Sequence, residues 1–165
     1  MINPADKIMT PSQAREYRDR LLAAGKKLVF TNGCFDILHK GHVEYLQKAQ
    51  SFGDKLIVGL NSDASVRRLK GDSRPIQDQE SRKIILEALR CVDEVIIFDE
   101  DTPYELIRKI QPDVLVKGAD YKPEDIVGYD IVKAKGGEVR TVEFVEGHST
   151  SRIIDRLVPK TAHSG

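Results

Sequence analysis

TNGCFDILHKGH, residues 31–42, marks the point where a predicted strand gives way to a predicted helix. The apolar run over residues 27–30 is typical of a buried strand. Over residues 43–50 the apolar side chains recur at the spacing of one helical face. Open α/β sheets bind their ligands where strands end and helices begin, so we expect this stretch to line a site.

The residue types in this stretch suit a phosphate ligand. His39 and His42 are three residues apart, so at the start of a helix they point to the same side. Gly33 allows a ligand to approach the backbone closely, and Gly41 allows the helix start to pack tightly. Because the free N–H groups of a helix N-terminus already favour anions, the pattern predicts a phosphate site with His39 and His42 above it.

NGCFD (residues 32–36) followed by HKGH (residues 39–42) resembles the G-x-F-D…H-x-G-H signature of the cytidylyltransferase-like nucleotidyltransferases. The resemblance implies that His39 and His42 bind a triphosphate and stabilise the transition state. It also implies nucleotide contacts for Thr31, Asn32, Gly33, Cys34, Phe35 and Gly41. Asp36 matches the aspartate of the signature and is expected to bind substrate, although a carboxylate at a turn can equally cap backbone amides.

STSRII, residues 149–154, resembles a second family motif, the I-S-S/T-T-x-I segment near the C-terminus. A helix start with hydroxyl and amide donors and a nearby cation suits phosphate. The resemblance therefore implies nucleotide contacts for Ser149, Thr150, Ser151 and Arg152. Taken alone, hydroxyls at a helix start are usually only caps. His148 departs from the apolar or tyrosine residue that is usual before this motif.

Two further segments resemble family elements at the ends of strands. Lys70 and Arg74 belong to a basic loop that closes over the substrates, where Lys70 would neutralise the transferring phosphate and Arg74 would bind substrate. KGADY, residues 117–121, resembles an element that contacts the base or the second substrate. It assigns Lys117 and Gly118 to the nucleotide and Asp120 to the other substrate, although Lys117 fits an ordinary strand-end cation equally well. Asn61, which follows another predicted strand, is also expected to bind substrate.

Strand-like and helix-like segments alternate along the chain. We expect strands over 27–30, 55–60, 94–98, 113–117 and 138–144, and helices over 11–24, 43–50, 79–90, 103–111, 124–135 and 152–158. This alternation predicts a single-domain Rossmann-like α/β fold, a parallel five-stranded sheet in the order 3-2-1-4-5 with helices on both faces. In the helix over 79–90, the spacing of Ile84, Ile85, Ala88 and Leu89 predicts the buried side.

Residues 1–25 form an expected N-terminal helical extension, and residues 26–165 form the expected nucleotidyltransferase domain. Thr10 to Gln13 has the pattern of a capping box with proline at the first helical position, which places the start of the first helix there. We expect the extension to pack outside the sheet or against a second subunit, so the protein is expected to be a homo-oligomer, dimer or higher.

The 165 residues include 26 basic and 26 acidic side chains. That balance gives no electrostatic reason to expect binding to nucleic acid or a membrane. The only cysteines, Cys34 and Cys91, lack the spacing of a disulfide framework or a cysteine zinc site, which favours the reducing cytoplasm and no metal ligands from the chain. The sequence also lacks a signal-peptide core and an apolar run of membrane-spanning length.

Residues 61–71, 117–121 and 146–151 resemble one branch of the family, the heptose 1-phosphate adenylyltransferases. This resemblance implies transfer of AMP from ATP, with Mg²⁺, to D-glycero-β-D-manno-heptose 1-phosphate, giving ADP-heptose for the lipopolysaccharide core. Only the resemblance separates adenine from cytosine. A glycerol-3-phosphate cytidylyltransferase and a non-catalytic nucleotide-binding regulator stay open as alternatives. The start at Met1 leads us to expect a stand-alone form without the sugar kinase that precedes this domain in many bacteria.

Overall fold

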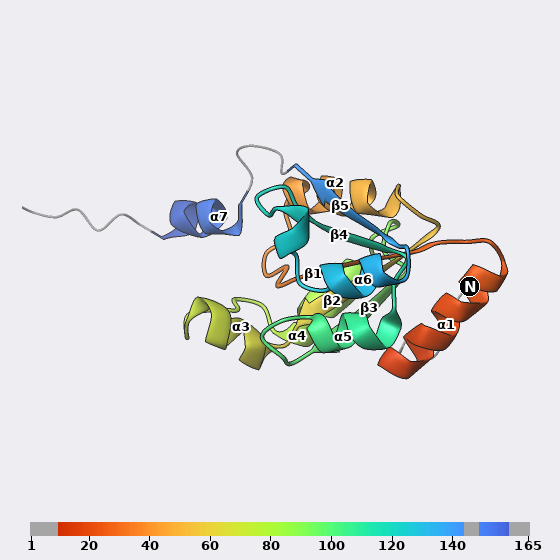
Figure 1. Cartoon of the computed structure of the whole chain (residues 1–165). Helices are drawn as coiled ribbons and strands as arrows, with labels where there is room; N and C mark the ends of the chain where they lie inside the picture. Colours follow the sequence, from red (N-terminus) through yellow and green to blue (C-terminus); the bar gives the residue numbers. More distant parts are fainter. Residues whose placement is uncertain (1–9, 144–148, 159–165) are drawn as a thin grey trace, which may run out of the picture.

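Five parallel strands form the centre of the molecule in the order β3-β2-β1-β4-β5, as predicted (Figure 1). The computed structural model describes residues 10–143 and 149–158, so the predicted strand end at Phe144 and the quoted segment over 146–148 lie outside the described residues. The strands are β1 (Leu28–Gly33), β2 (Lys55–Asn61), β3 (Glu94–Phe98), β4 (Val114–Gly118) and β5 (Glu138–Val142).

The helices lie between the strands and at both ends of the described chain. They are α1 (Pro11–Ala23), α2 (Lys40–Gln50), α3 (Asp63–Lys70), α4 (Gln79–Glu87), α5 (Tyr104–Ile110), α6 (Tyr129–Ala134) and α7 (Thr150–Leu157), with a short 3-10 helix, η2 (Pro123–Asp125). The predicted capping box is confirmed, because the Thr10 side chain accepts from the Gln13 amide and the Gln13 side chain accepts from the Thr10 amide. No helix in the described ranges is long and apolar enough to cross a membrane.

The sheet separates two apolar layers, because side chains of a strand point alternately to its two faces. In β1, Val29 packs in a cluster with Leu46 of α2 and Leu86 of α4. Its neighbour Phe30 packs on the other face with residues of α1, α5 and α6, including Ile107. All five of these side chains are fully buried. The strands that carry the site are therefore held from both faces, as predicted for a parallel sheet.

Neighbouring strands end at the same edge of the sheet. Gly33 of β1 pairs with Leu60 of β2, and the next residue of β2, Asn61, pairs with Phe98 of β3. Because all five strands run in parallel, the segments that follow them meet at this one edge. The C-terminal edge of the sheet is thus built from segments far apart in sequence.

The predicted continuous helix over 124–135 is wrong. The structure has η2 and then α6, with Gly128 between them in the left-handed conformation at φ +90°. A β-carbon at Gly128 would lie 2.7 Å from Ile107, so a side chain there is excluded by both backbone and packing. A glycine at this position therefore ends one turn and starts the next helix.

The buried side predicted for the helix over 79–90 is right only in part, because Leu89 packs against the core and Ile85 is half-buried. Ile84 is 64% exposed and Ala88 is exposed, whereas Arg82 and Leu86 are buried. An arginine is rarely buried unless its donors are all satisfied, so apolar spacing alone misplaces part of the buried side. The contacts that satisfy Arg82 lie beneath the site.

Candidate active site

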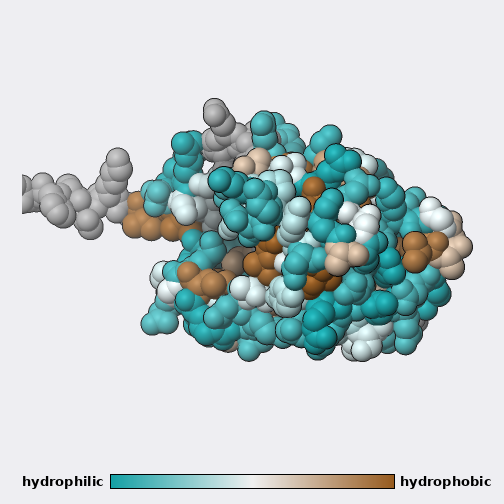
Figure 2. All heavy atoms as spheres, viewed as in Figure 1, coloured by the Kyte–Doolittle hydropathy of each residue, from teal (hydrophilic) through white to brown (hydrophobic). Residues whose placement is uncertain are grey.

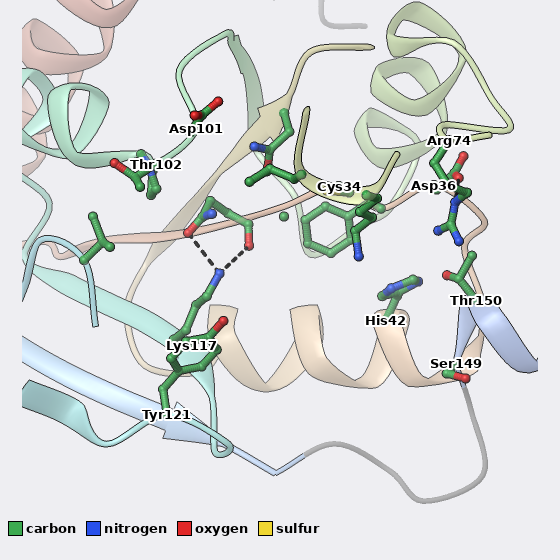
Figure 3. Close-up of a pocket in the computed structure, with 18 of the residues that line it drawn as sticks. Cys34, Asp36, His42, Arg74, Asp101, Thr102, Lys117, Tyr121, Ser149 and Thr150 are labelled. Atoms are coloured by element: carbon green, nitrogen blue, oxygen red, sulfur yellow. Dashed lines mark hydrogen bonds and ion pairs between the residues drawn. The ribbon is translucent and has the colours of Figure 1, made fainter. Parts of the chain in front are cut away.

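A cavity of about 700 Å³ opens at the C-terminal edge of the sheet. Most of the predicted site residues line it, namely Asn32, Gly33, Cys34, Phe35, Asp36, His39, His42, Asn61, Lys70, Arg74, Lys117, Ser149, Thr150 and Ser151. A smaller cavity of about 240 Å³ shares the Asn32–Phe35 wall, His42 and Lys117, and is closed by Tyr45, Gly118 and Asp120. Figure 3 shows His42, Arg74 and Thr150 toward one end and Asp101 and Thr102 toward the other, with Lys117 and Tyr121 below Asp101 and Thr102.

His39 and His42 stack against each other at the start of α2. Their ring centroids are 3.8 Å apart with an angle of 24° between the planes. The ring of Phe35 meets His42 edge-on at 5.3 Å. Burial, and then the neighbouring His39, lower the pKa of His42 from 6.5 to about 4, so His42 is neutral at pH 7. A neutral imidazole has one N–H, and His42 forms a hydrogen bond with the backbone of Ile37, so a phosphate oxygen would have to replace that partner.

The turn before the histidines depends on Gly33 and Phe35. A β-carbon on Gly33 would lie 2.9 Å from the Phe35 ring. Phe35 itself has φ +44°, an unusual conformation for a residue with a side chain. The glycine therefore leaves room for the ring that supports His42. Strain of this kind at a turn is found where the surrounding contacts hold it in place.

Asp36 lines the cavity, but hydrogen bonds within the protein occupy its carboxylate, which favours the alternative that it caps backbone amides. Its carboxylate is 2% exposed and accepts hydrogen bonds from Arg74 Nε at 2.7 Å and from the amides of Ile76 and Gln77 at 2.9 Å. Burial raises the pKa of Asp36, but these hydrogen bonds outweigh burial, so its pKa lies below the ordinary value. Asp36 thus ties the segment that follows α3 to the first turn, and Arg74 is fixed by the same ion pair.

Lys117 is a half-buried cation of the site. Its Nζ lies 3.3 Å from Asn32 Oδ1 and 3.5 Å from the Asn32 carbonyl, and 5.7 Å from the centre of the Tyr121 ring. Burial lowers its pKa, and Asp120 and Cys34 oppose that effect. No carboxylate in the described ranges forms an ion pair with Lys117. An anion in the cavity would supply the missing partner.

Cys34 lines both cavities. Burial raises the pKa of its thiol, although Lys70, Arg82 and Lys117 oppose that effect. The thiol therefore stays protonated at neutral pH and lacks the thiolate that a nucleophile needs. Cys34 contributes shape and its backbone to the site.

The N-terminus of α7 reaches the cavity only through its hydroxyl residues. Ser149 caps the helix by accepting from the Arg152 amide, and Thr150 donates to the carbonyl of Ile37 at 3.3 Å. Ser149, Thr150 and Ser151 line the cavity, as predicted. The Arg152 side chain is exposed and lines neither cavity, so the structure does not bring it together with the other predicted residues, and its nucleotide contact stays a prediction.

Two more of the predicted contact residues lie behind the cavity wall. Thr31 is fully buried, and its hydroxyl pairs with that of Tyr45 at 2.8 Å. Gly41 is buried in the first turn of α2. Neither residue lines a cavity, so their nucleotide contacts stay predictions.

Sequence reasoning missed several residues of the site. Arg82 lies beneath it, and Leu69, Asp101, Thr102, Pro103, Asp125, Ile126 and Val127 line the larger cavity. One signal was present for residues 101–103: they follow β3, and in this fold the segments after strands form the ligand site. No signal marked Arg82, because its role depends on contacts with segments distant in sequence.

Comparison with known proteins supports this geometry. The sequence profile of the family described as cytidylyltransferase-like matches residues 30–156. The chain belongs to the cytidylyltransferase-like family. The match spans the strand-to-helix turn with its histidines and the hydroxyl residues of α7, so the family elements are those that line the cavity.

The sequence relatives are longer proteins. The bifunctional protein HldE of Geobacter metallireducens is 62% identical over 136 residues, which cover 82% of this chain and 28% of that protein. HldE of Wolinella succinogenes is 60% identical over 144 residues, covering 87% of this chain and 29% of that protein. The chain thus spans less than a third of the length of these curated relatives.

Two solved structures of other proteins have similar folds. The lipopolysaccharide core biosynthesis protein of Thermoplasma volcanium is 28% identical, with a TM-score of 0.58, over 73% of this chain and 98% of that one. Pantoate-beta-alanine ligase of Francisella tularensis, complexed with ATP and beta-alanine, is 18% identical, with a TM-score of 0.57, over 82% of this chain and 66% of that one. At 18% identity the likeness concerns the fold alone.

Proposed function

We propose that this chain transfers AMP from ATP to D-glycero-β-D-manno-heptose 1-phosphate, giving ADP-heptose and pyrophosphate. The observation that carries the proposal is the set of donors around one cavity, with stacked His39 and His42, the cation Lys117 and the hydroxyls of α7. High identity to proteins called HldE and the likeness to a lipopolysaccharide core biosynthesis protein support the choice of acceptor.

The site suits a reaction in which the nucleophile is already charged. A phosphomonoester has a second pKa of about 6, so the acceptor phosphate is largely ionised at neutral pH and needs no general base. Its oxygen attacks the α-phosphorus in line, a new P–O bond forms, and the bond to the bridging α–β oxygen breaks to release pyrophosphate. The protein has to align the two substrates and stabilise the charge on both sides.

The residues divide these tasks by position. His39 and His42 donate to the triphosphate from the start of α2, and the hydroxyls of Ser149 and Thr150 reach it from α7. Lys117 lines both cavities, and an oxygen of the α-phosphate or of the acceptor would replace Asn32 as its partner. These groups act by hydrogen bonding and charge, and none of them forms a covalent intermediate.

We propose that Mg²⁺ enters with the nucleotide as MgATP. No group of three histidine, cysteine, aspartate or glutamate side chains that could hold a metal ion occurs in residues 10–143 and 149–158. Mg²⁺ in nucleotide sites is commonly held by phosphates and waters with few protein ligands, so this donor set fits a metal that arrives as part of the substrate.

A panel of nucleotides and acceptors tests the proposed function. Purified protein is given ATP, CTP or GTP with heptose 1-phosphate or glycerol 3-phosphate, and pyrophosphate release is measured. We expect ATP with heptose 1-phosphate to be turned over fastest. Equal or faster turnover of CTP with glycerol 3-phosphate would contradict the assignment, and nucleotide binding without turnover of any pair would favour a regulator.

We also propose that the protein is a cytoplasmic homo-oligomer. Both cysteines are free, which suits a reducing compartment. No residue of α7 is buried, Leu157 is 73% exposed, and the helix extends from the body with hydrophobic surface on it (Figures 1 and 2). Contact with a second copy would cover such surface. A mass measured by light scattering that equals one chain would contradict this proposal.

A further inference from the structure

Arg82 is the largest side chain in the described structure that is fully buried. It projects from α4 and lines neither cavity. Nε donates to the carbonyl of Gln77 at 3.0 Å, and Nη1 donates to the carbonyls of Cys34 and Asn61, each at 2.8 Å. Nη2 pairs with Asp63 Oδ1 at 2.7 Å. One guanidinium thus joins the motif turn, the end of β2, the start of α3 and the segment before α4.

Burying a charged guanidinium costs desolvation free energy, so the contacts of Arg82 must compensate that cost. The ion pair with Asp63 compensates the charge, and the three carbonyls accept from three more of the five N–H groups. Since the charge is already paired, Arg82 adds little field to the cavity. The planar guanidinium instead orients the groups that accept its hydrogen bonds, because it presents several N–H groups at fixed angles and an ammonium does not.

The contact with the Cys34 carbonyl fixes a peptide group of the site. A trans peptide is planar, with its N–H on the side opposite its C=O. The Cys34 carbonyl is turned toward buried Arg82, so the N–H of Phe35 in the same peptide is turned the other way. Cys34 and Phe35 both line the cavity, and no described residue accepts from the Phe35 N–H. The φ of +44° at Phe35 belongs to the same turn.

We propose that Arg82 is a positioning residue of the transfer reaction. It holds the Cys34–Phe35 peptide so that the Phe35 N–H faces the reacting phosphates, and it locks this turn to the end of β2 through the Asn61 carbonyl. A donor held in place before the substrate arrives stabilises developing charge without reorganisation. The inference rests on the proposed function only for the choice of assay.

Arg82→Lys tests the proposal, because lysine keeps the charge and loses the fork. We expect Arg82→Lys to lower kcat by about 10²-fold, the loss that misplacement by roughly 1 Å produces. The KM values for nucleotide and acceptor should change by less than about threefold, because the interaction is made chiefly in the transition state. Arg67→Lys is the matched control, since Arg67 is exposed on neighbouring α3 and should leave kcat unchanged.

Two further measurements separate positioning from a role in stability. The melting temperature shows whether Arg82→Lys is folded at the assay temperature, and guanidinium ion added to Arg82→Ala should restore part of kcat by filling the vacated site. If Arg82→Ala does not fold, the kcat of folded Arg82→Lys decides alone. A folded Arg82→Lys with normal kcat would overturn the proposal, as would a loss confined to the KM for nucleotide.

Different results would contradict the proposed function and the proposed role of Arg82. If wild-type protein releases no pyrophosphate with ATP and heptose 1-phosphate, the proposed function fails. The comparison of Arg82→Lys with wild type is then made on the nucleotide and acceptor that the wild type does use. A variant that loses kcat on that pair still supports the role of Arg82.

Discussion

At the scale of single residues, His42 links the chemistry of the site to the stability of the fold. Burial lowers its pKa from 6.5 to about 4 in the folded protein. Between these values the unfolded chain binds a proton at His42 that the folded chain does not bind. The free energy of unfolding should therefore decrease as pH falls from 6.5 to about 4, and the contribution of His42 should be complete above pH 6.5.

Thermal melting of wild type and His42→Asn across this pH range checks the effect. The asparagine does not titrate, so its melting temperature should fall less steeply than that of wild type. The aspartates whose pKa values lie below the ordinary range, such as Asp36, act at lower pH and are common to both proteins. Equal slopes for the two proteins would mean that His42 titrates normally in the folded state.

The same residue carries a kinetic prediction. His42→Ala should lower kcat by on the order of 10²-fold or more, as expected for loss of a donor to developing negative charge. The KM for ATP should rise less than kcat falls, because charge on the leaving pyrophosphate grows in the transition state. Steady-state kinetics measure both. A near-normal kcat in His42→Ala would move the catalytic role to Lys70 and Lys117.

At the scale of elements, α7 is the part whose role changed most between sequence and structure. Its hydroxyl residues Ser149, Thr150 and Ser151 line the cavity, whereas Arg152 faces solvent. A cation in the first turn opposes the helix dipole, which made a phosphate partner for Arg152 attractive on sequence alone. In the structure the Arg152 side chain is exposed to solvent, which screens its unfavourable interaction with the helix dipole.

A matched pair of variants on α7 tests this arrangement. Thr150→Val removes a hydroxyl that lines the cavity and should reduce the rise in melting temperature that MgATP confers, because ligand stabilisation follows affinity. Arg152→Ala should leave that rise unchanged and the melting temperature without ligand equal or slightly higher. Melting curves with and without MgATP measure this rise for wild type and for both variants. A smaller rise in Arg152→Ala would show that its side chain reaches the triphosphate.

The elements also show where sequence patterns succeed. The strand-to-helix turn and its histidines were predictable because local features agree there: an apolar run, glycines, and two imidazoles three residues apart. The division of residues 123–134 into η2 and α6 was not predictable, because it depends on the φ of +90° at Gly128 and on the contact of Gly128 with Ile107. A glycine inside a helical pattern does not by itself reveal its φ.

At the scale of the whole molecule, the sheet order was predictable from the alternation of elements, since handedness and the ligand edge leave few topologies. The hydrogen bonds that support the site from beneath were not predictable from the sequence. Arg82 and Asp36 act by hydrogen bonds to carbonyls and amides about 40 residues away, and these contacts exist only once β1 and β2 lie side by side. The sequence therefore favours a substrate contact for Asp36. Apolar spacing likewise predicts Ile84, and not Arg82, on the buried side of the helix.

The whole molecule also explains how two substrates could meet at one edge of the sheet. β1 leads through the turn to the histidines at the start of α2, β2 and β3 lead to the end of the cavity with Asp101 and Thr102, and β4 carries Lys117 (Figure 3). The larger and smaller cavities share the wall from Asn32 to Phe35. A phosphorus atom above this shared wall would be reached from both cavities, which is the arrangement that in-line attack requires.

The most direct test of this account follows the phosphorus atoms of ATP. Protein is incubated with heptose 1-phosphate and ATP labelled at either the α- or the γ-phosphate, and the products are separated. The account predicts that α-label appears in ADP-heptose and that γ-label appears only in pyrophosphate. Transfer of γ-label to the sugar, with release of ADP, would contradict attack at the α-phosphorus and with it the proposed function of the site.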